Sequence, residues 1–126
     1  NYNQSCDDNL IEGITFDGNY ENNNDGATIC AIKIRGQNNI IKGCKFINFA
    51  VGADQAWECF PVYCVPINET EQGPKILNNI FTSVGRKKNS NPGYCPEVTF
   101  IAVGGTDPVV EGNIFDKERA IFLGKG

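Results

Sequence analysis

The sequence predicts an all-β fold in which short strands and sharp corners repeat along the chain as a solenoid. Three observations lead to this prediction. First, an aliphatic residue, a glycine or asparagine two residues later and a phenylalanine three residues after that occur together four times. Second, the apolar residues of these segments do not follow the 3.6-residue period of a helix, and glycine recurs in their middle. Third, the stretches between them are rich in Asn, Gly, Pro and Ser, as loops are.

The four segments align column by column on their final phenylalanines. They are Leu10–Phe16, Asn38–Phe46, Ile76–Phe81 and Val109–Phe115. The phenylalanines follow one another at intervals of 30, 35 and 34 residues, which indicates stacked structural units. Five residues before each phenylalanine stand Ile11, Ile41, Ile76 and Val110. Three residues before it stand Gly13, Gly43, Asn78 and Gly112.

We interpret each segment as a strand, a corner and a second strand. Gly and Asn adopt positive φ at low steric cost, so the column that they share predicts the corner. Asn79 and Asn113 share the next column. We expect their side-chain amides to hydrogen-bond between neighbouring units, as stacked amides do elsewhere.

Apolar strands upstream extend the repeat. AIKIRG (Ala31–Gly36) and FIAVGG (Phe100–Gly105) each end in glycine ten residues before a repeat phenylalanine. VYCVPIN (Val62–Asn68) occupies the same place without glycine, and AIFLG (Ala120–Gly124) begins another copy. These repeats resemble those of the right-handed parallel β-helix, or pectin-lyase-like, superfamily over nearly the whole chain. The resemblance implies a right-handed parallel β-helix solenoid of about four coils, formed by residues 1–126 as one domain.

Length and composition limit the function further. The chain has 126 residues, of which 40% are hydrophobic, and it contains no apolar run long enough to span a membrane. Its net charge of −4 and the lack of a basic face argue against a nucleic acid partner. It has no His, the usual base of nucleophilic triads. Because the chain starts at Asn1 and ends within a repeat at Gly126, we expect a fragment of, or a module from, a longer secreted protein.

Six cysteines and two glycosylation sequons indicate a secreted, oxidising location. The cysteines are Cys6, Cys30, Cys44, Cys59, Cys64 and Cys95, and the sequons begin at Asn3 and Asn68. A zinc site is the alternative, but the chain has neither a CxxC pair nor His. Cys30 lies 16 residues before Phe46, and Cys64 lies 17 residues before Phe81. The two cysteines therefore fall at nearly the same position of neighbouring repeats, and we predict a disulfide between them.

Three insertions fall in the same interval, after a repeat phenylalanine and before the next strand. They lie in Asp17–Gly26, Ile47–Phe60 and Val84–Glu97. In a solenoid this spacing places all of them on one side, where they would form a wall. Insertions gathered in this way often mark the binding face of a repeat protein.

Acidic residues in or near the insertions are candidate catalytic groups. They are Asp25, Asp54, Glu58, Glu97 and Glu118. A carboxylate pair can act as general acid and base on a glycosidic bond, and the resemblance implies a polysaccharide lyase or a glycoside hydrolase if the protein is an enzyme. The alternative is that these are solvated turn residues with no catalytic role. CAIKIRG resembles a stretch of polygalacturonase-like enzymes, but Thr28 and Ile29 stand where the paired aspartates of that stretch are, so we do not transfer those roles.

Aromatic and basic residues near the insertions are candidate substrate-binding groups. They are Trp57, Tyr63, Tyr94, Arg86, Lys87 and Lys88. Sugar rings stack on aromatic rings, and cations contact uronates or sulfates. The same residues could instead pack a loop or form a solvated loop tip. By strand alternation Lys33, Arg35 and Lys42 face outward, where they could simply discourage edge-to-edge association.

Two function classes remain open at this point. The first is an extracellular carbohydrate-binding or polysaccharide-processing module with a glycan partner, in which binding is favoured over catalysis. The alternative is a structural or adhesive module that stacks end to end as a homo-oligomer. Calcium could bind where Asp and Asn cluster, at Asp7–Asn9 and Asn22–Gly26, although neither has EF-hand spacing.

Overall fold

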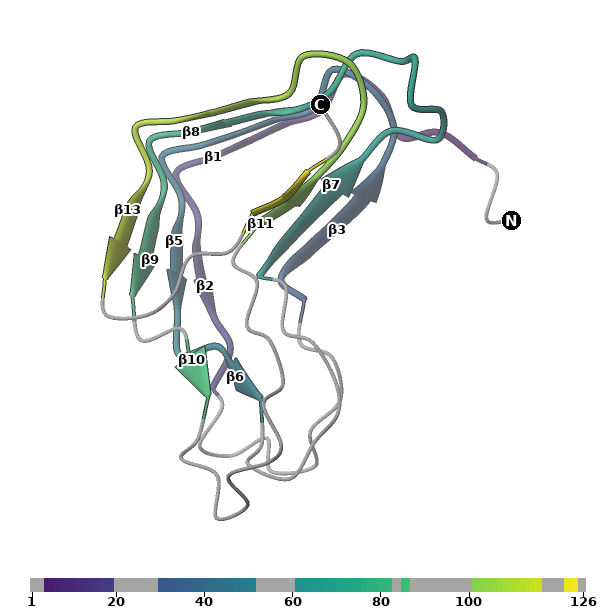
Figure 1. Ribbon diagram of the computed structural model, residues 1–126. Coiled ribbons are helices and arrows are strands. Elements are labelled where there is room, and N and C mark those ends of the chain that lie inside the picture. Colours follow the sequence, from purple (N-terminus) through teal and green to yellow (C-terminus); the bar gives the residue numbers. More distant parts are fainter. Residues whose placement is uncertain are drawn as a thin grey trace.

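The computed structural model describes residues 4–19, 30–51, 61–82, 85–86, 101–116 and 122–124. Every regular element within these ranges is a β-strand, and every strand pair is parallel (Figure 1). The prediction of an all-β fold is therefore confirmed for the described part of the chain.

Three four-stranded sheets enclose the core. Sheet A contains β1 (Leu10–Glu12), β4 (Ile40–Lys42), β8 (Lys75–Leu77) and β12 (Val109–Glu111). Sheet B contains β2 (Thr15–Asp17), β5 (Lys45–Ile47), β9 (Ile80–Thr82) and β13 (Ile114–Asp116). Sheet C contains β3 (Ile32–Arg35), β7 (Val62–Val65), β11 (Ile101–Val103) and β14 (Phe122–Gly124). The chain passes through C, A and B in turn and then returns one level further along, a topology consistent with a β-solenoid.

Figure 1 shows sheet A across the top of the molecule, sheet B on the left and sheet C on the right. A fourth, two-stranded sheet pairs β6 (Ala50–Val51) with β10 (Gly85–Arg86). These strands lie near the starts of the second and third insertions, so these two insertions leave the sheets next to each other. Most of both insertions lies outside the described residues.

The repeat phenylalanines form a continuous stack inside sheet B. Phe16 pairs in register with Phe46, Phe46 with Phe81, and Phe81 with Phe115. Their ring centroids are separated by 5.2, 4.7 and 5.1 Å, and the rings are nearly parallel. The separations match the spacing of neighbouring strands, so each level adds one ring to the stack.

The aliphatic column faces this stack from sheet A, and sheet C closes the core. Ile41 and Ile76 are fully buried between Ile11 and Val110, which are partly buried. Sheet C contributes Ile32, Val62, Cys64, Ile101 and Val103. The aliphatic and phenylalanine columns of the repeat therefore lie in the core or against it.

The corner between sheets A and B has the predicted backbone conformation. Residues Gly13, Gly43, Asn78 and Gly112 all have positive φ, between 54° and 69°. A second corner of this kind, between sheets C and A, was not predicted: Asp8, Asn38 and Asp107 have φ of 57°, 55° and 47°. Asp and Asn tolerate this conformation because their short polar side chains bond locally.

Asparagine side chains connect successive levels at the A–B corner. Asn79 is fully buried; its Oδ1 accepts the Cys44 N–H (2.9 Å) and its Nδ2 donates to the Ile41 carbonyl (3.0 Å). One level further, Asn113 Oδ1 accepts the Asn79 N–H (2.9 Å) and Nδ2 (3.0 Å), and Asn113 Nδ2 donates to Ile76 (2.8 Å). The predicted amide ladder is confirmed.

A second, unpredicted ladder lies at the C–A corner. Asn39 is also fully buried, and its Oδ1 accepts both the backbone N–H (3.0 Å) and the Nδ2 (2.9 Å) of Asn9. Its Nδ2 donates to the Cys6 carbonyl (2.8 Å). Together with the Cys6 N–H, which donates to Arg35, this bond holds the segment of residues 4–9 on the first complete level.

Gly43→Ala isolates the cost of the corner conformation, because an added Cβ would meet no heavy atom within 4 Å. We expect a loss of about 1–2 kcal/mol in the free energy of unfolding, from the left-handed backbone alone. Gly43→Asn should lose clearly less, because Asn78 already adopts this conformation. Urea denaturation of the two variants measures the difference. Equal losses would contradict this account of the column.

Asn79→Ala tests the ladder. It leaves the Cys44 N–H and the Ile41 carbonyl without their side-chain partner in the buried corner, and each such group costs about 1–3 kcal/mol. We expect Asn113→Ala to cost less, because Asn113 is only partly buried. Thermal and urea unfolding of both variants provide the comparison. An Asn79 loss no greater than the Asn113 loss would show that burial does not set the strength of the ladder.

Candidate functional site

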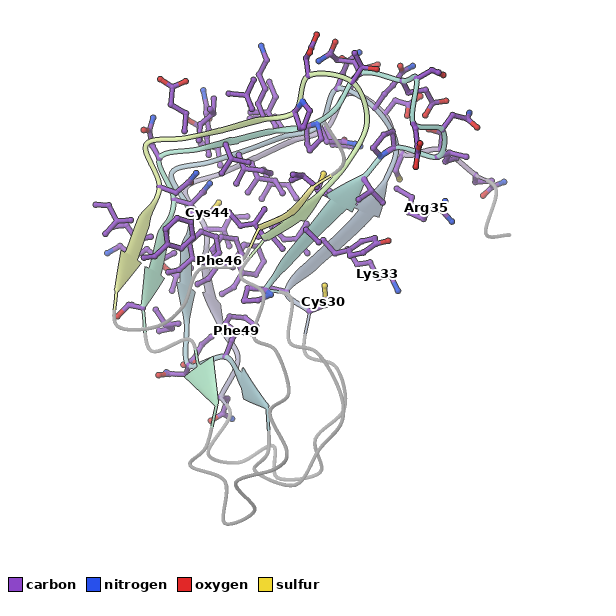
Figure 2. All side chains as sticks on the ribbon, in the orientation of Figure 1. Cys30, Lys33, Arg35, Cys44, Phe46 and Phe49 are labelled. Atoms are coloured by element: carbon purple, nitrogen blue, oxygen red, sulfur yellow. The ribbon has the colours of Figure 1, made fainter. Side chains whose placement is uncertain are left out.

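The outward face of sheet C carries a ring and two cations on adjacent levels. Side chains alternate along β3, so that Ile32 is buried while Lys33 and Arg35 are exposed. On β7, Val62 and Cys64 are buried, and Tyr63 and Val65 are half-buried. Figure 2 shows Lys33 and Arg35 projecting from sheet C away from the core that contains Phe46.

Strand register brings these side chains together. Lys33 pairs with Tyr63, and Tyr63 pairs with Ala102 on the next level. The Lys33 Nζ lies 5.7 Å from the centroid of the Tyr63 ring, within the range of a cation–π contact. Arg35 pairs with Val65, two residues further along the strands. We call Lys33, Arg35 and Tyr63 the sheet C face.

Chemically, the sheet C face combines an aromatic ring with two exposed cations, groups that suit a ligand with an apolar face and a negative charge. A tyrosine ring offers apolar area together with a polar tip, and the exposed cations attract anions. The chain as a whole has a net charge of −4, so this positive group is local rather than a property of the whole surface.

Two cysteines lie on or next to the strands of sheet C, and burial keeps both thiols protonated. Cys30, half-buried near the start of β3, donates its thiol to the Ile32 carbonyl (3.2 Å; Figure 2). Burial raises the pKa of the Cys30 thiol, and the nearby Lys33 charge opposes only part of that shift. Cys64 points into the core, where burial raises the pKa of its thiol to about 12. Thiols protonated in this way are poor nucleophiles at neutral pH.

The predicted Cys30–Cys64 disulfide is wrong. Cys6, Cys30, Cys44 and Cys64 are free thiols, and Cys64 pairs with Ile34 rather than lying beside Cys30. Counting from the phenylalanines failed because the corner between sheets C and A varies in length: it takes residues 66–74 after β7 but only 36–39 after β3. The predicted disulfide positions Cys59 and Cys95 lie outside the described residues.

Of the predicted substrate-binding residues, Tyr63 belongs to the sheet C face and Arg86 lies on β10. Trp57, Tyr94, Lys87 and Lys88 lie outside the described residues. So do the candidate catalytic residues Asp25, Asp54, Glu58, Glu97 and Glu118, and the sequon residue Asn3. Lys33 and Arg35 were predicted to face outward, but they were not recognised as binding groups. Aligning IKIR with VYCV would have placed Lys33 beside Tyr63.

A carboxylate organises the turn that follows β7. Glu71 accepts the N–H groups of Ile67 (3.1 Å) and Asn68 (3.2 Å) and the Nδ2 of Asn68 (2.9 Å). These bonds, led by the Asn68 side chain, lower the pKa of the Glu71 carboxyl, while the Asp7 charge works weakly against them. The Asn68 sequon is thus part of an ordered, exposed turn.

The residues proposed for calcium are engaged within the chain. Asp7 accepts bonds from the Ser5 hydroxyl and from the Gln37 N–H (2.9 Å), which lower the pKa of its carboxyl. Asn9 bonds to Asn39. In the described ranges no three His, Cys, Asp or Glu side chains come together as a metal site would require. Asn22–Gly26 lies outside those ranges.

Comparisons of the chain with protein-family models, with curated proteins and with solved structures find no match in any of the three. The strand pairing itself defines the class of protein: over the described residues it is all-β, with parallel strands in stacked sheets. Where the chain is described, no helix is long and apolar enough to cross a membrane.

Acid should loosen the turn around Glu71. The folded pKa of this carboxyl lies below its ordinary value of 4.5, so its stabilising bonds are complete above pH 4.5 and are lost as the pH falls through the folded pKa. We expect the amide NMR shifts of Ile67 and Asn68 to titrate together in that range. Glu71→Gln should abolish the titration. Shifts in the wild-type protein that stay constant through that range would contradict this role.

Proposed function

We propose that this chain is an extracellular carbohydrate-binding module that holds an acidic polysaccharide on the sheet C face. The observation that carries the proposal is the placement of the Lys33 ammonium group over the Tyr63 ring, with Arg35 exposed on the same face. Within the proposal, the fold is a right-handed parallel β-helix of about four coils, similar to the pectin-lyase-like superfamily, and the protein is secreted.

Tyr63 supplies the stacking surface. Its register neighbours are the exposed Lys33 on one level and the small, buried Ala102 on the next, and Tyr63 itself is half-buried. A sugar ring that stacks there buries its apolar face while its hydroxyl groups stay in water. The gain comes from the apolar area that the two rings remove from water, at roughly 25 cal/mol per Å².

Lys33 and Arg35 supply selectivity for negative charge. They are exposed, so each attraction is modest and is screened by salt. A polymer with a carboxylate or sulfate on each sugar can form ion pairs with both cations at once, whereas a neutral polymer can form none. Binding should therefore favour uronic-acid or sulfated chains and should weaken as ionic strength rises.

Binding is favoured over catalysis because the groups on this face suit recognition. The outward side chains described on β3 and β7 are a lysine, an arginine, a tyrosine and a valine. A glycosidase or lyase of this design would need carboxylates from the insertions, among Asp25, Asp54, Glu58, Glu97 and Glu118.

The alternative function, end-to-end assembly into a rod, rests on the outer levels of the solenoid. Ile11 and Phe16 at one end occupy the same columns as Val110 and Phe115 at the other, and all four are only partly buried. However, no surface feature of these end levels combines aromatic and charged groups as the Lys33–Tyr63 pair does among the described residues. We therefore rank binding ahead of stacking.

Affinity electrophoresis in gels that contain polygalacturonate tests the proposal. We expect Tyr63→Ala to weaken binding about tenfold, which corresponds to about 1.4 kcal/mol. The double variant Lys33→Ala, Arg35→Ala should remove most of the salt dependence. The control is Lys45→Ala, Lys75→Ala, which deletes two exposed lysines from sheets B and A and should bind normally.

Three other outcomes would change the proposed function. Equal weakening by the control pair would show a general charge effect and would overturn the assignment of the site to sheet C. Release of reducing ends or unsaturated products would make the protein an enzyme. Growth of the sedimentation coefficient with concentration, without retardation on any glycan, would favour the rod.

A further inference from the structure

The corner after β7 is longer than its counterparts on neighbouring levels. The chain passes from sheet C to sheet A through residues 36–39 after β3 and through residues 104–108 after β11, but it uses residues 66–74 after β7. The added length forms an exposed turn that contains Asn68, Glu69 and Thr70. These three residues are an Asn-X-Thr sequon with no proline at the middle position.

We propose that Asn68 carries an N-linked glycan, presented by this extended corner. Attachment joins Asn68 Nδ2 to the anomeric carbon of an oligosaccharide held as a lipid diphosphate. The amide nitrogen gives one proton to a base of the transferase, the carbon–oxygen bond to the diphosphate breaks, and the lipid diphosphate departs with the electron pair of that bond. The donor and the transferase belong to the secretory pathway, so this inference rests on the proposed extracellular location and not on polysaccharide binding.

The contacts of the turn are compatible with an attached sugar. A primary amide has two N–H groups, and Asn68 Nδ2 uses one to donate to Glu71 Oε1 (2.9 Å). Glycosylation replaces one hydrogen and leaves the other, so the bond to Glu71 can persist. The backbone of the turn is also fixed independently of the Asn68 side chain, since the Thr106 N–H donates to the Glu71 carbonyl (2.8 Å).

The exposure of the turn gives the glycan space outside the core. Asn68, Glu69 and Thr70 are all exposed, whereas Pro66, Gly73 and Pro74 on either side are buried and anchor the ends of the corner. A sugar at Asn68 would therefore displace solvent rather than packed side chains.

The test is expression of the full chain behind a cleavable secretion signal in a eukaryotic host. Peptide mass spectrometry should find hexose and N-acetylhexosamine on the peptide that contains Asn68, and an amidase that removes N-glycans should leave Asp at that position. Thr70→Ala should abolish the modification while keeping Asn68 and Glu71 unchanged. Thr70→Ser should retain it, and Asn3→Gln should leave it unaffected.

A secreted wild-type protein with an unmodified Asn68 peptide would overturn the inference, as would a glycan that persists on that peptide in the Thr70→Ala variant. Circular dichroism of each variant checks that folding is intact. If the unmodified protein still binds polygalacturonate, only this inference fails. If the glycan is present and binding is absent, only the proposed function fails.

Discussion

The structure depends on how buried backbone groups are paired at its corners. A chain that turns between two packed sheets brings N–H and carbonyl groups into a dry interior, where each unpaired group costs as much as a lost hydrogen bond. Asn79 solves this at the A–B corner by accepting the Cys44 N–H and donating to the Ile41 carbonyl. Asn39 makes an equivalent pair of bonds at the C–A corner. Because the backbone groups at these corners are paired, the levels can stack around a hydrocarbon core.

Stacking at a fixed register also organises the outer surface. Because Ile32 pairs with Val62 in the core, Lys33 must lie beside Tyr63 outside it. The same rule that places one phenylalanine above another therefore assembles a ring and a cation on the sheet C face. A surface of this kind tolerates side-chain changes far better than the core does, since no neighbour inside the solenoid has to adjust.

The sequence predicted the features that recur on every level and failed where levels differ. The phenylalanine and aliphatic columns, the positive-φ corner and the Asn79–Asn113 ladder were all visible as repeats. The Asn39 ladder was not, because Pro74 and Pro108 precede the later strands of sheet A where Asn39 precedes β4. The Cys30–Cys64 prediction failed because corner length was taken as constant. Tyr63 could be proposed as a binding residue from its type alone, but its partners required the register of sheet C.

The amide ladders have a direction, and this bears on how the chain folds during synthesis. Asn39 reaches back to Cys6 and Asn9, Asn79 to Ile41 and Cys44, and Asn113 to Ile76 and Asn79. Even Cys44, which stands in the same column as Asn79 and Asn113, directs its thiol back towards the Ile11 carbonyl, at 3.8 Å. Each new level therefore brings the side chain that pairs polar groups of the level before it, as Asn113 does for the Asn79 N–H and the Ile76 carbonyl. Such a solenoid can grow vectorially from its N-terminal end, with every new turn templated by the one before it.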